Sequence, residues 1–372
     1  MEERLRYFGR RVDALIKGRN LTREEAREMF RQVLTGEQPD LQQGAFLAAI
    51  TAKGATPEEI AGSWEAIYEL DTVKVRPEVS GPLVENCGTG MDSIKTFNIS
   101  TAAAIVAAAD GVCMAKHGSR AITSRCGTVD ILEALGVGVE CDVSLVKRSI
   151  ERAGIGIFNG MSGQVHPQAL CRILSQIRFG TILNIAASLA NPALPTYGVR
   201  GVYSREMVLP IARAMHEIGY RRAMVVHGLD AGGRRGMDEM STLGETLVAE
   251  LGEDGEIVEY ALRPEEMGLE RCREEAIGVE PDRSMEALRM VRMLSGEDRG
   301  PRRDIICLNA APLLYITGRA SDLEEGVARA GEILESGRPV QKLKDWVMQQ
   351  SSNPGEHRER FEVLVETACS PS

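Results

Sequence analysis

The sequence predicts an α/β protein, with a small helical domain and a larger α/β domain built on a central mixed, mostly parallel sheet. Three observations lead to this prediction. The chain has 372 residues, more than one simple core usually contains. Residues 1–77 carry helical patterns and no strand signal. From about residue 78, short β-type runs alternate with helical segments, which is typical of a sheet with crossover helices.

Helix start signals recur in the N-terminal part. Thr22 and Glu25 have the spacing of a capping box. A second helix is expected over residues 43–53. Thr56 is then a strong N-cap candidate with Pro57 at the first helical position. The apolar residues of the first of these helices recur at helical spacing: Ala26, Met29, Phe30 and Val33.

The second part of the chain is expected to alternate strands and helices. Residues 168–190 interrupt it with a long helical segment that can rejoin the N-terminal helices. The expected strands are 112–114, 223–226 and 305–308, and the helices that follow them are 131–135, 242–251 and 323–334. The predicted helical domain is therefore 1–77 joined by about 168–195, and the α/β domain is 78–167 with 196–372. A cleft between the two is the default binding site.

Composition excludes some classes of protein. The chain is 43% hydrophobic and 26% charged, which are ordinary globular values. Its net charge of −10 argues against a general nucleic-acid binder, which would show a basic face. No apolar run is long enough for a membrane helix and no signal peptide precedes Leu5. Eight cysteines without a C-x-x-C pair favour buried, reduced thiols over disulfides or metal ligands. We expect a cytoplasmic protein.

A glycine turn before a helix start is the most informative stretch of the chain. The turn spans residues 88–92, and an apolar helix is expected over 102–109. Free N–H groups and the positive end of the dipole at a helix start attract anions, and glycines let the backbone approach a ligand. The segment predicts a phosphorylated substrate. Three polar side chains between turn and helix can bind phosphate or ribose hydroxyls, or simply cap the helix: Asn98, Ser100 and Thr101.

A second polar loop follows the strand expected at 112–114. Residues 116–120 and 123–128 supply three cations, two glycines and several hydroxyls. This density of donors favours a pyrophosphate cradle over a solvated loop. His117 alone means little, because a structural hydrogen bond is the commoner role of a single histidine.

Two adjacent carboxylates, Asp238 and Glu239, follow a glycine-rich loop. They suit Mg²⁺, which prefers hard oxygen ligands and bridges to phosphate oxygens. Alternatively, Asp238 caps a helix that begins near Ser241, with Glu239 in its acidic first turn. Taken in isolation, the pattern slightly favours the cap.

Together, the three blocks resemble the anthranilate phosphoribosyltransferase family, which also includes the pyrimidine nucleoside phosphorylases. The order and spacing of the shared motifs run through nearly the whole chain and favour the metal role of the two carboxylates over the cap. Signatures of other enzymes, such as G-x-x-x-x-G-K-[ST], G-x-S-x-G and H-E-x-x-H, are missing. The shared motifs are CGTGMD at 87–92, TFNIST at 96–101, KHGSR at 116–120, GTVDILEALG at 127–136, DEMS at 238–241 and LNAA at 308–311.

The resemblance implies a transfer of the phosphoribosyl group from phosphoribosyl pyrophosphate (PRPP) to anthranilate in tryptophan biosynthesis, with Mg²⁺ as cofactor and a homodimer as assembly. By residue match, Lys116, Asp238 and Glu239 are catalytic, and Ser100 joins the two carboxylates as a metal ligand. The implied PRPP-binding residues are Gly88, Gly90, Asp92, Thr96, Asn98, Ile99, Ser100, Thr101, Lys116, His117, Gly118, Ser119 and Thr128. The implied acceptor-binding residues are Gly88, Ser119, His166 and Arg172.

The acceptor side departs from the family pattern. Met91 stands where the family has glycine, and Ser119 where it has asparagine. The family arginine that grips the anthranilate carboxylate aligns with Leu174, while Arg172 and Arg178 are only nearby. Residues 180–189 have also lost an arginine and a Gly-Pro pair, and the 230–235 loop carries an arginine-rich insertion beside the metal candidates.

Three hypotheses remain open at this stage. The first is PRPP-dependent transfer to anthranilate with an altered acceptor pocket. The second is a paralogue that uses PRPP with another small aromatic or heterocyclic acceptor. The third is a non-catalytic or nucleic-acid-binding relative, which the acidic charge and the Asp238–Glu239 pair disfavour.

Overall fold

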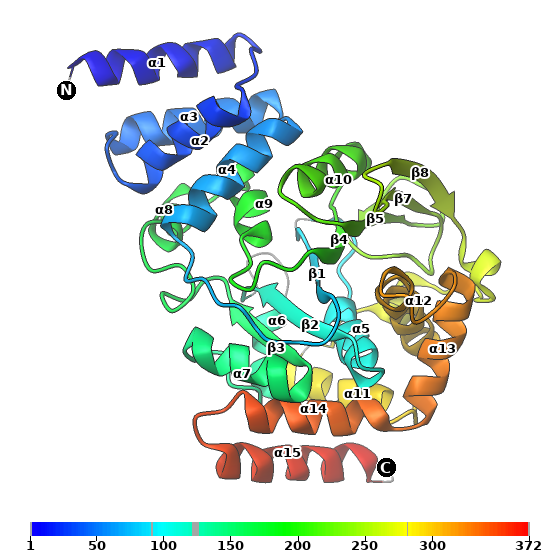
Figure 1. The fold of residues 1–372 in the computed structure, drawn as a ribbon. Helices are drawn as coiled ribbons and strands as arrows, with labels where there is room; N and C mark the ends of the chain where they lie inside the picture. The colour runs from blue at the N-terminus through cyan, green and yellow to red at the C-terminus, as the bar shows by residue number, and fades with distance from the viewer. Residues whose placement is uncertain (1, 91, 121–125, 281, 371–372) are drawn as a thin grey trace.

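The computed structural model describes residues 2–90, 92–120, 126–280 and 282–370. Four helices come first and stand at one end of the molecule, while the last two helices stand at the other end (Figure 1). The first four are α1 (Glu2–Ile16), α2 (Arg23–Leu34), α3 (Asp40–Lys53) and α4 (Pro57–Leu70), and the last two are α14 (Arg338–Gln349) and α15 (Pro354–Cys369).

The predicted caps of the early helices are confirmed. Thr22 and Glu25 form a capping box at α2, and Thr56 and Glu59 form another at α4, with Pro57 at its first position. Each box satisfies two backbone N–H groups that have no partner inside the helix. Residues 71–77 were expected to be helical, but α4 ends at Leu70 and these residues form no helix.

The centre of the fold is one mixed sheet with strand order β3-β2-β1-β4-β5-β7-β8, and β6 pairs with β5. Five neighbouring strands, β3, β2, β1, β4 and β5, are parallel, β6 and β7 pair antiparallel with β5, and β8 pairs antiparallel with β7. The predicted fold class is confirmed. The strands are β1 (Leu83–Gly88), β2 (Cys113–Gly118), β3 (Ile155–Asn159), β4 (Tyr197–Gly201), β5 (Arg222–Leu229), β6 (Gly236–Met237), β7 (Thr246–Leu251) and β8 (Ile257–Leu262).

The other helices cover the sheet or extend the helical end. They are α5 (Ile99–Ala109), α6 (Thr128–Ala134), α7 (Val143–Ala153), α8 (Leu170–Ile177), α9 (Ile182–Leu189), α10 (Val208–Glu217), α11 (Arg283–Leu294), α12 (Pro301–Ile316) and α13 (Leu323–Glu335). No helix in the described ranges is both long and apolar enough to cross a membrane.

Alternate residues of β5 separate the two main hydrophobic clusters. Met224 and Val226 pack in the cluster with α5 and α12, whereas Ala223 and Val225 pack in the cluster with α1–α4 and α8–α10. This follows from the two-residue period of a strand. Helix α9 packs against α4. The exact division into 1–77 with 168–195 and the remainder stays a prediction.

Two sequence-based assignments were wrong. Residues 242–251, expected as a helix, contain strand β7 instead. Leu243, Leu247 and Leu251 recur every four residues, as on a helix, but pairing with β5 overrides that local pattern. Residues 305–308, expected as a strand, lie inside helix α12, which is buried on nearly all sides and therefore lacks a polar face.

The helical segment expected over 168–190 is also different in detail. It consists of two short helices, α8 and α9, separated by residues 178–181. Thr181 begins α9 as the N-cap of a capping box with Asn184. The polar start signal inside the segment explains why one long helix does not form.

Candidate active site

The strand order reverses between β1 and β4, and the polar loops gather at the carboxyl ends of these strands. From β1 the chain proceeds outward to β2 and β3, then returns to place β4 on the other side of β1. Ligands of open α/β sheets bind at such a switch point. Gly88 ends β1 and pairs with Gly201 at the end of β4, and the N–H of Thr89 donates to the Gly201 carbonyl at 3.0 Å.

The segment carrying Asp238 and Glu239 crosses this switch point. The N–H of Gly90 donates to Asp238 Oδ2 at 2.7 Å, and the N–H of Ser100 donates to Glu239 Oε1 at 3.2 Å. The glycine turn, the start of α5 and the carboxylate pair therefore form one cluster. No helix begins near Ser241, so the alternative in which Asp238 caps such a helix is wrong.

Two glycines make room for the carboxylate segment. A Cβ on Gly88 would lie 2.0 Å from Asp238 Oδ2, and a Cβ on Gly201 would lie 1.6 Å from the Asp238 carbonyl oxygen. Both distances are far below van der Waals contact. Glycine is thus required at both strand ends for the backbone and the carboxylate to meet.

Polar atoms at the start of α5 lack partners. Asn98 is the N-cap residue, but its side chain makes no capping hydrogen bond. Asn98 Oδ1 and Thr101 Oγ1 are buried, and neither has a hydrogen-bond partner among the described residues. Buried polar atoms are almost always satisfied, so these two are suited to a ligand.

The environment of Asp238 and Glu239 disfavours their negative charges, which a bound cation would stabilise. Burial, followed by the charge of Asp92, raises the pKa of Asp238 to about 7. Burial and the neighbouring Asp238 raise the pKa of Glu239 well above its usual range. Within the described ranges, no lysine or arginine forms an ion pair with either carboxylate.

This donor set fits a divalent cation that keeps some non-protein ligands. Two carboxylates and the Ser100 hydroxyl are hard oxygen donors of the kind that Mg²⁺ takes together with water and substrate phosphate. The described residues contain no group of three or more His, Cys, Asp or Glu side chains that could hold a metal alone. The remaining ligands would therefore come from substrate and solvent.

Two buried histidines, His117 of the predicted PRPP set and His166 of the predicted acceptor set, lie beside one another. The rings of His117 and His166 are 5.5 Å apart between centroids. His117 Nδ1 lies 3.3 Å from the Ser188 carbonyl oxygen, and His166 Nδ1 lies 2.6 Å from the Asp71 carbonyl oxygen. A carbonyl only accepts, so each Nδ1 carries the proton and each Nε2 is a free acceptor.

Burial favours the neutral form of both imidazoles. Burial lowers the pKa of His117 to about 3 and also lowers the pKa of His166. Neither Nε2 atom has a hydrogen-bond partner in the part of the chain that the structure describes. The two Nε2 atoms are therefore uncharged hydrogen-bond acceptors for a ligand that carries N–H groups.

The sequence matches one family of known proteins over most of its length. Residues 80–340 match the family described as "Glycosyl transferase family, a/b domain", and residues 12–70 match its helical bundle domain. Anthranilate phosphoribosyltransferase of Anaeromyxobacter dehalogenans is 40% identical over 339 residues, covering 90% of this chain and 96% of that protein. The enzyme of Desulfosudis oleivorans is 37% identical and covers 93% of this chain and 99% of its own length.

The chain belongs to the anthranilate phosphoribosyltransferase family.

Solved structures of this family share the fold. The crystal structure of the Thermus thermophilus enzyme has a TM-score of 0.82 and 37% identity, covering 91% of this chain and 98% of that one. The Saccharomyces cerevisiae enzyme in complex with PRPP and Mg has a TM-score of 0.76 and 24% identity, covering 89% and 94%. At this identity the yeast structure supports the fold alone.

Asn86, which sequence reasoning missed, links two family motifs. Lys116 donates to Asn86 Oδ1 at 2.7 Å and to its carbonyl oxygen at 3.1 Å. Asn86 Nδ2 in turn donates to the Ser100 carbonyl oxygen at 2.7 Å. Lys116 is 1% exposed, and burial lowers its pKa to about 8. The only indication in the sequence is that Asn86 directly precedes the CGTGMD motif at 87–92.

We expect Asn86→Ala and Lys116→Met to affect stability non-additively. Asn86→Ala removes the side-chain oxygen that accepts from the buried Lys116 ammonium, leaves it only the backbone carbonyl, and should cost about 1–3 kcal/mol. In a background where Lys116→Met has removed the ammonium, the same change should cost about 1 kcal/mol less. Urea unfolding of the four proteins measures this coupling. Additive losses would contradict a direct Lys116–Asn86 interaction.

Some of the remaining predicted residues lie next to one another, and others have different partners or lie outside the described residues. A Cβ on Gly118 would lie 3.0 Å from Thr128 Cγ2, and the N–H of Val129 donates to the Ser119 carbonyl at 3.2 Å, so these predicted PRPP residues are neighbours. Asp92 pairs with Lys95 at 2.9 Å, and Thr96 forms a β-bridge to Gly278. Met91 and residues 121–125, which carry part of the second motif, lie outside the described residues.

Arg172 has partners away from the other predicted acceptor residues. It is exposed on α8, 3.8 Å from Asp40 of α3 and 3.5 Å from Gln176. Leu174, which aligns with the family's carboxylate-binding arginine, packs partly buried in the helical cluster. The assignment of Arg172 to the acceptor stays a prediction.

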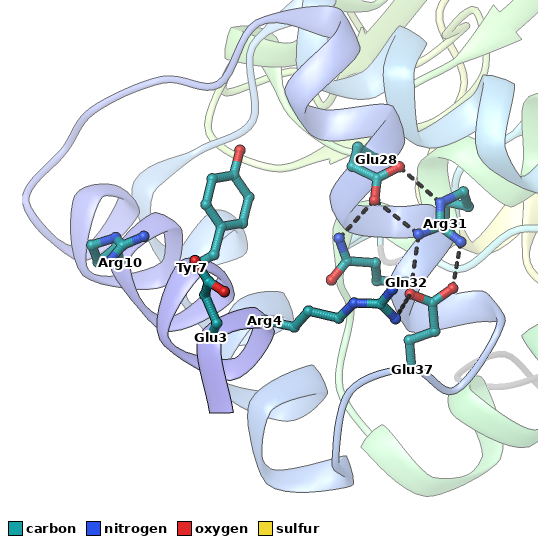
Figure 2. Close-up of a pocket in the computed structure, with 8 residues that line it drawn as sticks. All are labelled: Glu3, Arg4, Tyr7, Arg10, Glu28, Arg31, Gln32 and Glu37. Atoms are coloured by element: carbon teal, nitrogen blue, oxygen red, sulfur yellow. Dashed lines mark hydrogen bonds and ion pairs between the residues drawn. The ribbon is translucent and has the colours of Figure 1, made fainter. Parts of the chain in front are cut away.

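A cavity of about 460 Å³ lies between α1 and α2, remote from these motifs (Figure 2). Its charges balance, and Arg31 is paired with Glu28 at 2.8 Å and with Glu37 at 2.5 Å. A phosphate would find no net positive charge there. A second cavity, of about 340 Å³, lies beside β8 and α13. Neither contains a predicted site residue, so the expected cleft between the domains stays a prediction. The first is lined by Glu3, Arg4, Tyr7, Arg10, Glu28, Arg31, Gln32 and Glu37.

Proposed function

We propose that this protein transfers the 5-phosphoribosyl group of PRPP to the amine of anthranilate and releases pyrophosphate, a step of tryptophan biosynthesis, with Mg²⁺ as cofactor. The observation that carries the proposal is the cluster in which Gly90 and Ser100 both donate to the Asp238–Glu239 pair. The relatives at 37% and 40% identity, which carry this activity in their names, support it.

The donor half would bind PRPP through the turn, the start of α5 and the loop after β2. Backbone N–H groups and the helix dipole favour the phosphates. The unpartnered Asn98 Oδ1 and Thr101 Oγ1 are available to ribose hydroxyls or to a donor on the ligand. Ser100, Asp238 and Glu239 would hold Mg²⁺, which when bound neutralises the developing negative charge of the leaving pyrophosphate.

The reaction needs positioning more than a nucleophile. The bond from ribose C1 to the pyrophosphate oxygen breaks, and a bond from C1 to the acceptor nitrogen forms. Holding the amine in line with C1 supplies much of the rate. The free Nε2 atoms of His117 and His166 are suited to accept the two N–H groups of a primary aromatic amine. The amine nitrogen then loses one proton, which the released pyrophosphate or solvent takes up.

A PRPP-dependent enzyme with a different acceptor is the second candidate. Leu174 is apolar and Arg172 is turned toward Asp40, so no described arginine is matched to an anthranilate carboxylate by alignment. An acceptor without a carboxylate would not lose the bidentate contact that an arginine normally provides.

The assay that tests the proposed function follows the fluorescence of anthranilate in the presence of enzyme, Mg²⁺ and PRPP. We expect a decrease that stops when PRPP, Mg²⁺ or enzyme is left out. A thermal shift with Mg²⁺ and PRPP, measured in parallel, reports donor binding. Donor binding with unchanged anthranilate would favour the second candidate, and no donor binding would contradict both.

We further propose a homodimer joined through the helical domain, in a cytoplasmic location. Ile16 at the end of α1 is 71% exposed and Leu41 on α3 is 88% exposed, which leaves apolar surface for a second copy. Light scattering should give twice the chain mass of 40.5 kDa, and a monomer mass would contradict the dimer.

A further inference from the structure

Arg200 of β4 forms a buried ion pair beneath the helical end of the molecule. Its guanidinium donates to Glu85 Oε1 of β1, and both side chains are 1% exposed. Tyr220 donates to the same Glu85 oxygen at 2.6 Å, and Asn191 donates to Glu85 Oε2 at 3.0 Å. Both oxygens of Glu85 therefore have hydrogen-bond partners, and one end of the Arg200 guanidinium is fixed.

The other end of Arg200 contacts α9. Arg200 Nη1 donates to Ser188 Oγ at 3.0 Å, and Nη2 donates to the Ser188 carbonyl oxygen at 3.3 Å. This carbonyl oxygen is also the acceptor for His117 Nδ1. Hydrogen bonds therefore connect Glu85 to Arg200, Arg200 to Ser188, and Ser188 to His117.

Stability alone does not explain Arg200. Burying an ion pair costs desolvation that its attraction often fails to repay. Arg200 Nε has no hydrogen-bond partner among the described residues, which adds a further cost. Helix α9 already packs into the hydrophobic cluster of α1–α4 and α8–α10 through its own apolar residues Leu183 and Ala186. A costly buried group whose hydrogen bonds beyond its ion pair go to a single residue, Ser188, is typical of a positioning role.

We propose that Arg200 is a positioning residue for the acceptor: by holding the Ser188 carbonyl over His117, it keeps the His117 Nε2 lone pair directed at the acceptor amine. The inference rests on the proposed function. Among the described residues, Arg200 hydrogen-bonds to Glu85 and Ser188 and not to Ser100, Asp238 or Glu239. Replacing Arg200 should therefore weaken binding of the acceptor substrate and leave PRPP binding unchanged.

Arg200→Lys is the main variant, because it keeps a positive charge beside Glu85. An ammonium cannot reach Glu85 and both Ser188 oxygens together. We expect the KM for anthranilate to rise about tenfold, since two hydrogen bonds are lost, and the KM for PRPP to change less than about twofold. Ser188→Ala removes only the Oγ contact and should raise the anthranilate KM about threefold.

Tyr220→Phe is the matched control. It removes another hydrogen bond to the same Glu85 oxygen and leaves both Arg200–Ser188 hydrogen bonds in place. We expect the anthranilate KM of this variant to stay within about twofold of wild type, because the Ser188–His117 contact is intact.

The tautomer of His117 provides a readout that general loosening would not give. The chain has five histidines, so ¹⁵N-histidine NMR is tractable, and His117→Gln assigns the signals of His117. Wild type and Tyr220→Phe should show His117 as the Nδ1–H tautomer. Arg200→Lys should show a mixture with the Nε2–H form, because the carbonyl that fixes the proton is released.

The outcomes separate this inference from the proposed function. If wild-type protein forms no product from anthranilate, the proposed acceptor is wrong, and the His117 tautomer in Arg200→Lys still decides the positioning role. If wild type is active while both Arg200→Lys and Ser188→Ala keep its anthranilate KM and its tautomer, the inference is overturned. It is also overturned if Tyr220→Phe matches Arg200→Lys. Should Arg200→Lys not fold, Ser188→Ala decides by the same criteria.

Discussion

Replacing Asp238 with Asn and Glu239 with Gln is expected to lower kcat/KM on the order of 1000-fold or more, because the site then loses both charges that we propose hold Mg²⁺ against the leaving pyrophosphate. The fold should be retained. The amide oxygens can still accept from the N–H groups of Gly90 and Ser100, which donate to the carboxylates in the wild type.

The same double variant should be at least as stable as wild type without Mg²⁺. The folded-state pKa of Asp238 is raised to about 7 and that of Glu239 is also raised. A carboxyl group whose pKa is higher in the folded state lowers the free energy of unfolding as pH rises through that folded-state pKa. Removing the two charges should therefore remove this destabilisation at pH 8. Added Mg²⁺ and PRPP should raise the Tm of wild type only.

Asp230→Asn is the control for this experiment. Asp230 follows β5 in the same hairpin, but it is partly exposed and accepts from the N–H of Arg234 at 2.9 Å. It should leave turnover nearly unchanged. If the double variant retained activity within about tenfold of wild type, the metal role of Asp238 and Glu239 would be wrong.

Gly88→Ala is expected to cost about 100-fold in kcat/KM, the size of loss that a displacement of about 1 Å can cause. The new Cβ would lie 2.0 Å from Asp238 Oδ2, so the carboxylate must move away from the Gly90 N–H that now holds it. Steady-state kinetics with PRPP and anthranilate, at saturating Mg²⁺, measures the loss.

Gly44→Ala is the matched glycine substitution and should act in the opposite direction. Gly44 lies within α3, and its added Cβ would meet nothing within 4 Å. The change should raise stability by about 0.5–1 kcal/mol through helix propensity and leave turnover intact. Full activity in Gly88→Ala would mean that Asp238 does not need the position seen in the structure.

The sequence was most informative where local chemistry determines structure. The caps at Thr22 and Thr56 were predictable because a hydroxyl three residues before a glutamate satisfies backbone donors without tertiary help. The meeting of the glycine turn with Asp238 and Glu239 was predictable from family motifs alone. Nothing in the spacing of 148 residues between Gly90 and Asp238 shows that they touch.

The errors arose where tertiary contacts override local preference. Strand β7 has the leucine spacing of a helix, but its hydrogen bonds go to β5. Asn86, Glu85 and Arg200 were missed because their roles come from buried partners on other strands and helices. No periodicity or motif marks such residues, since burial of a charged group is visible only once the sheet is assembled.

The most direct test of the central claim is a calorimetric titration of the protein with PRPP, with and without Mg²⁺. The claim is that the glycine turn, the start of α5 and the Asp238–Glu239 pair form a single Mg²⁺-dependent PRPP site. Wild type should bind one PRPP per chain in the presence of Mg²⁺, and the binding should be lost with EDTA or in the Asp238→Asn, Glu239→Gln variant. PRPP binding of equal strength without Mg²⁺, or in the variant, would contradict the claim.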